Sequence, residues 1–349
     1  MLQSVLLQIR NKPELIVLGI MILVIAMLIL PLPTYIVDLL IGLNIVILLL
    51  VLMSSFYITK IIHFTSFPAL LFITTLFRLA LSISTSRLIL LDADAGDIIT
   101  SFGQFVIGDN LIVGLVIFDI VTVVQFILIT KGSERVAEVA ARFSLDAMPG
   151  KQMSIDADLK SGIIDNEGVK HRRIELEQES QLYGAFNGAM KFIKGDAIAG
   201  IVIIFVNFLG GISVGMVQMG FSFSETLTTY TMLTIGDGLV AQILALLISI
   251  STGFIVTRVG GTQKNLGQNI IKELFFHDFS LIITAALTFI MGFLPGFPTL
   301  IFILLSILIS GSYLRKTLLN KKRLKIRKKL VASIVVLATE KIIFNRNLM

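Results

Sequence analysis

Eight long apolar stretches constrain the fold of this chain more than any other feature of its sequence. They cover residues 15–33, 36–57, 69–91, 111–130, 197–219, 233–256, 281–295 and 298–313. A helix needs about 20 largely apolar residues to cross the hydrocarbon of a bilayer. We therefore predict an all-α polytopic membrane protein with about eight transmembrane helices. The last two stretches are short and share the turn 294–298, so they form either a tight helical hairpin or one long broken helix.

The composition supports this class and excludes several others. Hydrophobic residues make up 55% of the chain and charged residues 15%, against about a quarter charged in soluble domains. Cysteine is absent, which excludes disulfides and thiolate zinc sites. The histidines are scattered and no glycine-rich phosphate-binding loop occurs, so we expect no metal, no cofactor and no enzymatic activity. The basic residues cluster beside the apolar stretches, so we expect no nucleic-acid partner.

Connections that contain lysine or arginine alternate with connections that contain neither. The first, third and fifth connections contain none, whereas the second, fourth and sixth connections and the chain ends are basic. The basic positions include Arg10, Lys12, Lys60, Lys131, Arg135, Arg142, Lys151, Arg258, Lys264, Lys272, Arg315 and Lys316. Because basic connections stay in the cytoplasm, we predict that both termini and the long middle connection are cytoplasmic. No cleavage site follows the first stretch, so we expect it to be retained as a span.

The middle connection, residues 131–195, differs in composition from the rest and is predicted to be a helical cytoplasmic subdomain. Residues 133–143 place small and apolar side chains at helical spacing. Pro149 suits the first turn of a second helix that runs to about Leu159, and Gly162 ends it. Residues 166–194 are predicted to form a third, long helix with Asn166 as its N-cap.

Several ionisable residues lie inside or beside the apolar stretches, where charge is costly. Arg78 lies near the middle of the third stretch, and a charge there costs about 2.5–3.5 kcal/mol on insertion scales. Asp119 of the fourth stretch falls at a similar depth, so we predict that the two pair. The pair is a structural contact, a point on an ion or proton path, or both. Asp38, Asp196 and Asp237 are further carboxylates in or near the spans.

The second helix predicted in the middle connection carries Lys151, Asp156 and Asp158. Asp156 lies four residues before Lys160, so the two share a helix face, and Lys151 and Asp158, seven residues apart, share another. These side chains are either ordinary solvated ion pairs or a protonation switch. A carboxylate acts as such a switch only if burial or a like charge raises its pKa.

The run RFSLDAMPGKQMSIDADL at residues 142–159 resembles the signature of the FHIPEP family. Supporting runs are FPALL at 67–71, ITKG at 129–132, KFIKGD at 191–196, TIGDGL at 234–239 and IVTRV at 255–259. The resemblance covers nearly all of residues 15–315, and STSR at 84–87 is closer to the injectisome branch than to the flagellar branch. Proteins of this family are large export-gate membrane proteins of type III secretion, in flagella and in virulence injectisomes.

The resemblance implies a mechanism that composition does not show. Members of the family use the proton motive force to drive export of unfolded proteins across the bacterial inner membrane. Their implicated charges match Arg78, Lys151, Asp156 and Asp196, with Asp38 a weaker match. The implied partners are further copies in a ring of nine, other export-apparatus membrane proteins, a secretion ATPase complex and chaperone-bound effectors. The secondary candidates for proton coupling are Asp158, Asp38, Asp119 and Asp237.

Four regions follow from these predictions. They are a first membrane bundle at 1–130, the middle subdomain at 131–195, a second membrane bundle at 196–314 and a basic linker at 315–349. The family carries a large C-terminal cytoplasmic domain, and this chain ends where the linker to it is expected. Leu244 stands where the family commonly has a proline, which removes the basis for a proline kink there.

Two other functions are compatible with the residues. A secondary transporter or channel for a small solute or ion also combines several spans with embedded charges, although we find no inverted repeat. A passive scaffold would recruit partners through its basic tail and middle connection. Neutralising Arg78 and Asp156 tests the scaffold, because a scaffold tolerates both changes.

Overall fold

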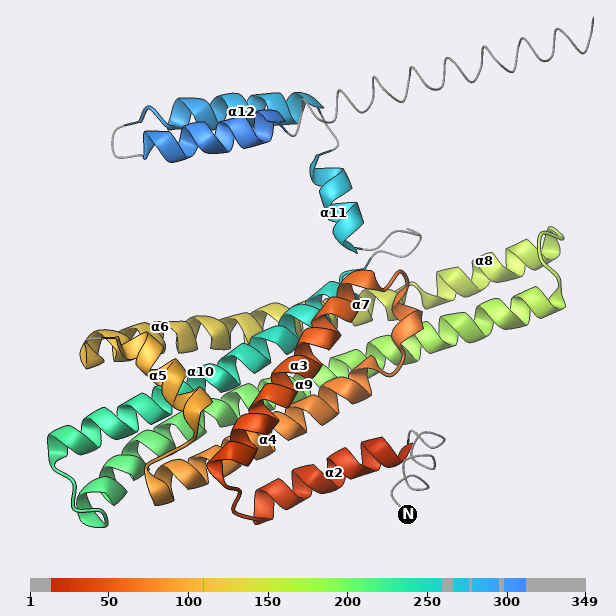
Figure 1. The fold of residues 1–349 in the computed structure, drawn as a ribbon. Coiled ribbons are helices and arrows are strands. Elements are labelled where there is room, and N and C mark those ends of the chain that lie inside the picture. The colour runs from red at the N-terminus through yellow and green to blue at the C-terminus, as the bar shows by residue number, and fades with distance from the viewer. Residues whose placement is uncertain (1–13, 109, 259–265, 276–277, 295–297, 312–349) are drawn as a thin grey trace, which may run out of the picture. The chain divides into compact units, whose positions relative to one another are not determined.

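The structure is a computed structural model, and it describes residues 14–108, 110–258, 266–275, 278–294 and 298–311. Every regular element within these residues is a helix (Figure 1). The predicted all-α class is therefore confirmed for the described part of the chain. The chain divides into two compact units, residues 1–266 and 267–349.

The first unit is organised around one long helix, α10 (Phe223–Val256). Helices α3, α4, α5, α6 and α9 all pack against α10. The bounds of the helices before the middle connection are α2 (Glu14–Ile29), α3 (Thr34–Tyr57), η1 (Ile61–Phe64), α4 (Phe67–Asp92), α5 (Asp97–Ile107) and α6 (Leu111–Ile127). Close contact between α5 and α10 depends on Gly236, since a Cβ there would meet the carbonyl oxygen of Ile99.

Charged side chains close the ends of the shorter helices in this unit. Asp38 of α3 accepts hydrogen bonds from the backbone N–H groups of Asp97 (2.9 Å) and Ile98 (3.2 Å), so it caps the first turn of α5. Arg87 of α4 donates to the carbonyl oxygen of Ile29 (3.1 Å) at the C-terminal end of α2. The negative charge of Asp38 suits the positive partial charge at the N-terminal end of α5. The positive charge of Arg87 suits the negative partial charge at the C-terminal end of α2.

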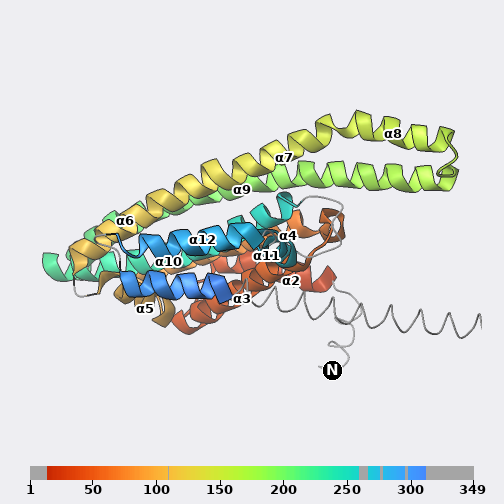
Figure 2. The same cartoon turned by 90° about the horizontal axis from the view of Figure 1, so that it is seen from above.

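A helical hairpin, residues 134–194, extends from the bundle (Figures 1 and 2). Helix α6 continues through a π-helical turn, η2 (Leu128–Ser133), into α7 (Glu134–Asp146) and α8 (Met148–Lys160). Gly162 takes a φ of +73° in the turn that follows, and α9 (Asn166–Val217) runs back to the bundle. The predicted helices of the middle connection are therefore present. Ile155, Val169 and Leu176 form a small apolar core between the two sides.

Helix α9 is one element of 52 residues, where the sequence suggested a helix in the middle connection and a separate span. At 1.5 Å per residue it is about 78 Å long, more than twice the ~30 Å hydrocarbon core of a bilayer. The composition of α9 changes from polar to apolar along its length, but its backbone stays helical throughout. Its N-cap is Asp165, whose side chain accepts from the N–H of Gly168 at 2.8 Å, so the assignment of the cap to Asn166 is wrong.

Among the described residues, five helices are long and apolar enough to cross a membrane. The number is six if the bent pair Leu266–Leu274 and Phe279–Met291 forms one span. Shorter apolar helices lie at Val17–Ile29, Asp97–Ile107 and Thr299–Gly311. The structure thus supports a polytopic membrane protein, and the figure of eight spans stays a prediction.

The second unit contains most of α11 (Leu266–Leu274), then α12 (Asp278–Met291) and a helix at Thr299–Gly311. The last two lie side by side, joined by a hydrogen bond from Ser306 Oγ to the carbonyl oxygen of Ala285 at 2.9 Å. This contact favours a hairpin over one broken helix. Several residues used in the sequence analysis lie outside the described part of the chain: Arg10, Lys12, Lys264, the turn residues 295–297 and the basic tail from Arg315 onward.

Candidate functional site

Arg78 of α4 lies in the interior of the bundle, with 4% of its surface exposed. Its guanidinium forms an ion pair with Asp196 of α9, which is 7% exposed. Its Nη1 also donates to the carbonyl oxygen of Ala241 in α10 at 3.0 Å. The predicted partner, Asp119, is instead exposed on α6, so that pairing is wrong. Counting residues along a span gives the depth of a side chain, but not the side of the helix from which it projects.

Asp237 of α10 is a second buried carboxylate, 5% exposed, and it also links three helices. Thr85 Oγ1 of α4 donates to Asp237 Oδ1 at 2.6 Å. Asn207 Nδ2 of α9 donates to Asp237 Oδ2 at 3.2 Å, and Asn207 is fully buried. Polar contacts of this kind between spans hold helices together where lipid offers no hydrogen-bond partner.

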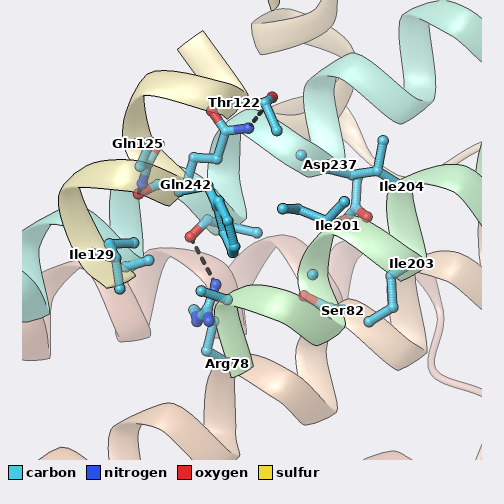
Figure 3. A pocket seen from close by; sticks show the side chains of 16 residues that line it. Arg78, Ser82, Thr122, Gln125, Ile129, Ile201, Ile203, Ile204, Asp237 and Gln242 are labelled. Atoms are coloured by element: carbon cyan, nitrogen blue, oxygen red, sulfur yellow. Dashed lines mark hydrogen bonds between the residues drawn. The ribbon is translucent and has the colours of Figure 1, made fainter. Parts of the chain in front are cut away.

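A cavity of about 50 Å³, lined by α4, η2, α6, α9 and α10, reaches both Arg78 and Asp237 (Figure 3). Its other polar lining residues are Ser82, Thr122, Gln125 and Gln242. Gln242 Nε2 donates to Thr122 Oγ1 at 2.6 Å, and the Gln125 amide donates to the backbone carbonyl of Gln242. A water molecule occupies about 10–15 Å³ on this measure, so the cavity has room for water beside the charged groups.

On the hairpin, the predicted residues form ion pairs across its two sides and not along α8. The pairs are Asp156–Arg173 (2.7 Å), Asp158–Arg172 (2.6 Å) and Lys151–Glu179 (3.0 Å). Between 29% and 56% of each of these side chains is exposed. Solvated pairs of this kind fix the alignment of two helices at little gain in free energy.

A larger cavity, about 410 Å³, opens beside the middle of the hairpin. Lys151, Arg172 and Glu179 line it from the hairpin, Lys60 from the connection after α3, and Arg258 from the end of α10. The predicted residue Lys151 therefore faces a cavity lined by side chains of both charges, and not the interior of the bundle.

The structure separates the predicted site residues into groups. It brings Arg78 and Asp196 together, with Asp237 on the same cavity, and it keeps these three apart from the pairs on the hairpin. Asp38 serves α5 as a cap and Asp119 lies on an exposed face. Within the described residues, no group of three or more acidic or histidine side chains is placed to hold a metal ion.

Three residues of the interior site were not predicted from the sequence: Thr85, Thr122 and Gln125. Thr122 and Gln125 lie three residues apart in a helix that is apolar apart from these two and Asp119, a spacing that puts Thr122 and Gln125 on one face. That spacing was the available signal. Thr85 gives no such signal, because a serine or threonine in a helix commonly donates to a carbonyl group of its own helix, as Ser86 does to Ser82.

The sequence profile of the FHIPEP family matches residues 24–335 of the chain. Protein MxiA of Shigella flexneri is 68% identical over 323 residues, which cover 93% of this chain and 47% of that protein. Invasion protein InvA of Salmonella typhimurium is 68% identical over 310 residues, covering 89% and 45%. Harpin secretion protein HrpI of Erwinia amylovora is 51% identical over 306 residues, covering 86% and 43%. The chain spans about half the length of these curated relatives, and no solved structure matches it.

Proposed function

The chain belongs to the FHIPEP family, and from this membership we propose that it is the membrane part of the export gate of a type III protein secretion apparatus. The observation that carries the proposal is the family match over residues 24–335. Two of its relatives are named for invasion and for harpin secretion. The protein would pass unfolded effector proteins across the bacterial inner membrane, with both termini and the hairpin in the cytoplasm. We assign it no enzymatic reaction.

In this proposal several copies, nine by resemblance, form a ring beneath a secretion channel. Other export-apparatus membrane proteins surround the ring in the bilayer. The secretion ATPase complex and chaperone-bound effectors would dock on a C-terminal cytoplasmic domain that follows the region aligned here. The relatives are about twice as long as the aligned region, which leaves room for such a domain in them.

The proton motive force drives export in this proposal, through charges that lie near the start and in the middle of helix α9 or contact it there. Asp156 binds and releases a proton, Lys151 holds the hairpin beside it, and Arg78 and Asp196 couple the hairpin to the span. Helix α9 supports this assignment, because it runs unbroken from Arg173, the partner of Asp156, to Asp196. Asp196 follows Arg173 by 23 positions, which corresponds to about 35 Å of helix. A movement of the hairpin would therefore reach the interior ion pair.

Secretion by the full-length protein carrying Asp156→Asn tests this coupling. We expect the variant to assemble normally and to lose secretion, because the amide cannot release a proton. Asp146→Asn is the matched control, since Asp146 is also an exposed, paired carboxylate of the hairpin, and it should secrete normally. Normal secretion by Asp156→Asn would remove the protonation step from the proposal.

A second candidate is a secondary transporter or channel for a small ion, favoured by the polar cavity beside Arg78 and Asp237. Reconstitution of the full-length protein in liposomes without partner proteins distinguishes the two. Selective flux of a small cation that depends on Asp237 would favour a self-sufficient transporter. Impermeable liposomes, together with secretion defects in cells, favour the export gate.

A further inference from the structure

The proposed function gives no role to the cavity of about 410 Å³ beside the middle of the hairpin. Four basic side chains line this cavity, and they come from two parts of the first unit. Lys151 and Arg172 belong to the hairpin. Lys60 and Arg258 follow the ends of α3 and α10. We propose that the cavity is a binding site for a phosphate-bearing anion, either a lipid head group at the membrane surface or a soluble phosphate compound.

The lining of the cavity has an excess of positive charge. It contains two carboxylates, those of Glu175 and Glu179, against the four basic side chains. Glu179 pairs with Lys151 at 3.0 Å, and Arg172 pairs at 2.6 Å with Asp158, which lies outside the lining. Even with Asp158 counted, four positive charges face three negative ones. A cavity in which one sign of charge is in excess raises the local concentration of ions of the opposite sign, so it favours an anion.

The two basic side chains from the bundle suit a phosphate group. Lys60 is exposed and forms no ion pair within the described part of the chain. Arg258 is 8% exposed, and a charge shielded from water attracts an opposite charge more strongly than a solvated one. A guanidinium binds phosphate oxygens through two parallel hydrogen bonds, and an ammonium binds them as a point charge.

The rest of the lining favours a lipid head group over free phosphate. Ile61, Ile155 and Leu176 form part of the wall, and each is at most 9% exposed. The volume lies within the range of about 300–1,000 Å³ that is usual for ligand pockets. In the proposed topology, Lys60 and Arg258 lie at the cytoplasmic ends of two spans. Basic pockets between spans on that side are typical binding places for anionic head groups.

A ligand held by both groups of basic side chains would connect the hairpin to the bundle. Lys151 and Arg172 would contact it from the hairpin, and Lys60 and Arg258 from the ends of the spans. The position of the hairpin would then depend on the anions available at the membrane surface. This inference rests on the proposed function only for the side of the membrane on which the cavity lies.

Cysteine labelling of the full-length protein tests the proposal. Ser154 lines the cavity and is exposed, so Ser154→Cys places a reactive thiol on its wall. This chain contains no cysteine, and any cysteine beyond it is replaced by serine. The labelling rate with uncharged N-ethylmaleimide is measured in nanodiscs of phosphatidylcholine and in nanodiscs of equal parts phosphatidylcholine and phosphatidylglycerol. A ligand at ten times its Kd protects a thiol about tenfold, and we expect a fall of that size with phosphatidylglycerol.

Inorganic phosphate added to the phosphatidylcholine nanodiscs distinguishes the two sources. Protection by phosphatidylglycerol alone identifies a lipid head group, and protection by inorganic phosphate alone identifies a soluble compound. Protection by both shows that the phosphate group suffices, and protection by neither overturns the proposal. Gln152→Cys is the matched control, because Gln152 is an exposed residue of the same helix outside the lining. Equal slowing at that position would reveal a general effect of the membrane surface and would also overturn the proposal.

Two charge changes connect the protection to the basic side chains. Lys60→Gln and Arg258→Gln, each combined with Ser154→Cys, should remove most of the protection. Lys60 is exposed, so Lys60→Gln decides the matter if the protein with Arg258→Gln does not fold. Lys131→Gln removes an exposed lysine just after α6, outside the cavity, and should keep the protection. Full protection with Lys60→Gln would overturn the proposal. The labelling needs no secretion, so its result is independent of that of Asp156→Asn.

Discussion

The bundle interior and the hairpin contain the same kinds of charged side chain in opposite surroundings. In the interior, Arg78 and Asp196 pair with 5% and 6% of their side chains exposed. On the hairpin, Asp156 and Arg173 pair with 47% and 56% exposed. Water compensates the loss of a partner on the hairpin, whereas the interior has little water to do so. The energetic contribution of each charged pair therefore depends on its exposure to water, which the sequence motifs around the two pairs do not reveal.

The largest expected effect is that of Arg78→Met. It leaves Asp196 buried without its cation, and removing one partner of a buried pair costs about 3–5 kcal/mol in the free energy of unfolding. Denaturant unfolding in detergent, followed by circular dichroism, measures the loss. The double variant Arg78→Met with Asp196→Leu removes both partners and should regain most of it. A single variant as stable as the parent protein would show that the interior pair is solvated after all.

A smaller loss is expected from Gly236→Ala, which probes packing in the interior without changing any charge. The added Cβ would meet the carbonyl oxygen of Ile99, and such overpacking costs about 1–3 kcal/mol. Gly253→Ala on the same helix is the matched control, because nothing lies within 4 Å of the new Cβ. Alanine there should be neutral or slightly stabilising. Equal effects of the two changes in the same unfolding measurement would contradict the close contact of α5 with α10.

The smallest effect is expected on the hairpin. A double-mutant cycle of Asp158→Ala and Arg172→Ala should give a coupling of about 0.2–1 kcal/mol, and added salt should lower it. The free energy of unfolding of the four proteins at low and high salt measures this coupling. A coupling as large as that of the interior pair, and insensitive to salt, would mean that the hairpin is shielded from water.

Much of the helical layout could be predicted from the sequence. The stretch 36–57 corresponds to α3 (Thr34–Tyr57), and Pro149 and Gly162 mark the start and end of α8 as expected. Helix α5 was read as part of a connection, because its eleven residues are too few to span a bilayer. Its position depends on Asp38 and Gly236, two residues distant in the sequence from α5.

Less of the site could be predicted. The sequence showed that Arg78 needs a partner within the protein, but depth along a span did not identify it. Asp196 was predicted only to lie in or near a span, and it contributes to the interior because α9 passes that point without a break. The hairpin pairs were equally hidden, since the partners of Asp156 and Asp158 come from the returning helix.

The sequence by itself determined that apolar helices are long enough to cross a membrane, that a polar hairpin interrupts them, and which charges lie near lipid. These properties depend on local composition and spacing, which can be read directly from the sequence. Only the tertiary structure decided that Arg78 forms its ion pair with Asp196 and not with Asp119. The same holds for the hydrogen bonds from Thr85 and Asn207 to Asp237. The physical reason is that pairing depends on the rotation of each helix about its axis, which is fixed by packing against neighbours far away in the sequence.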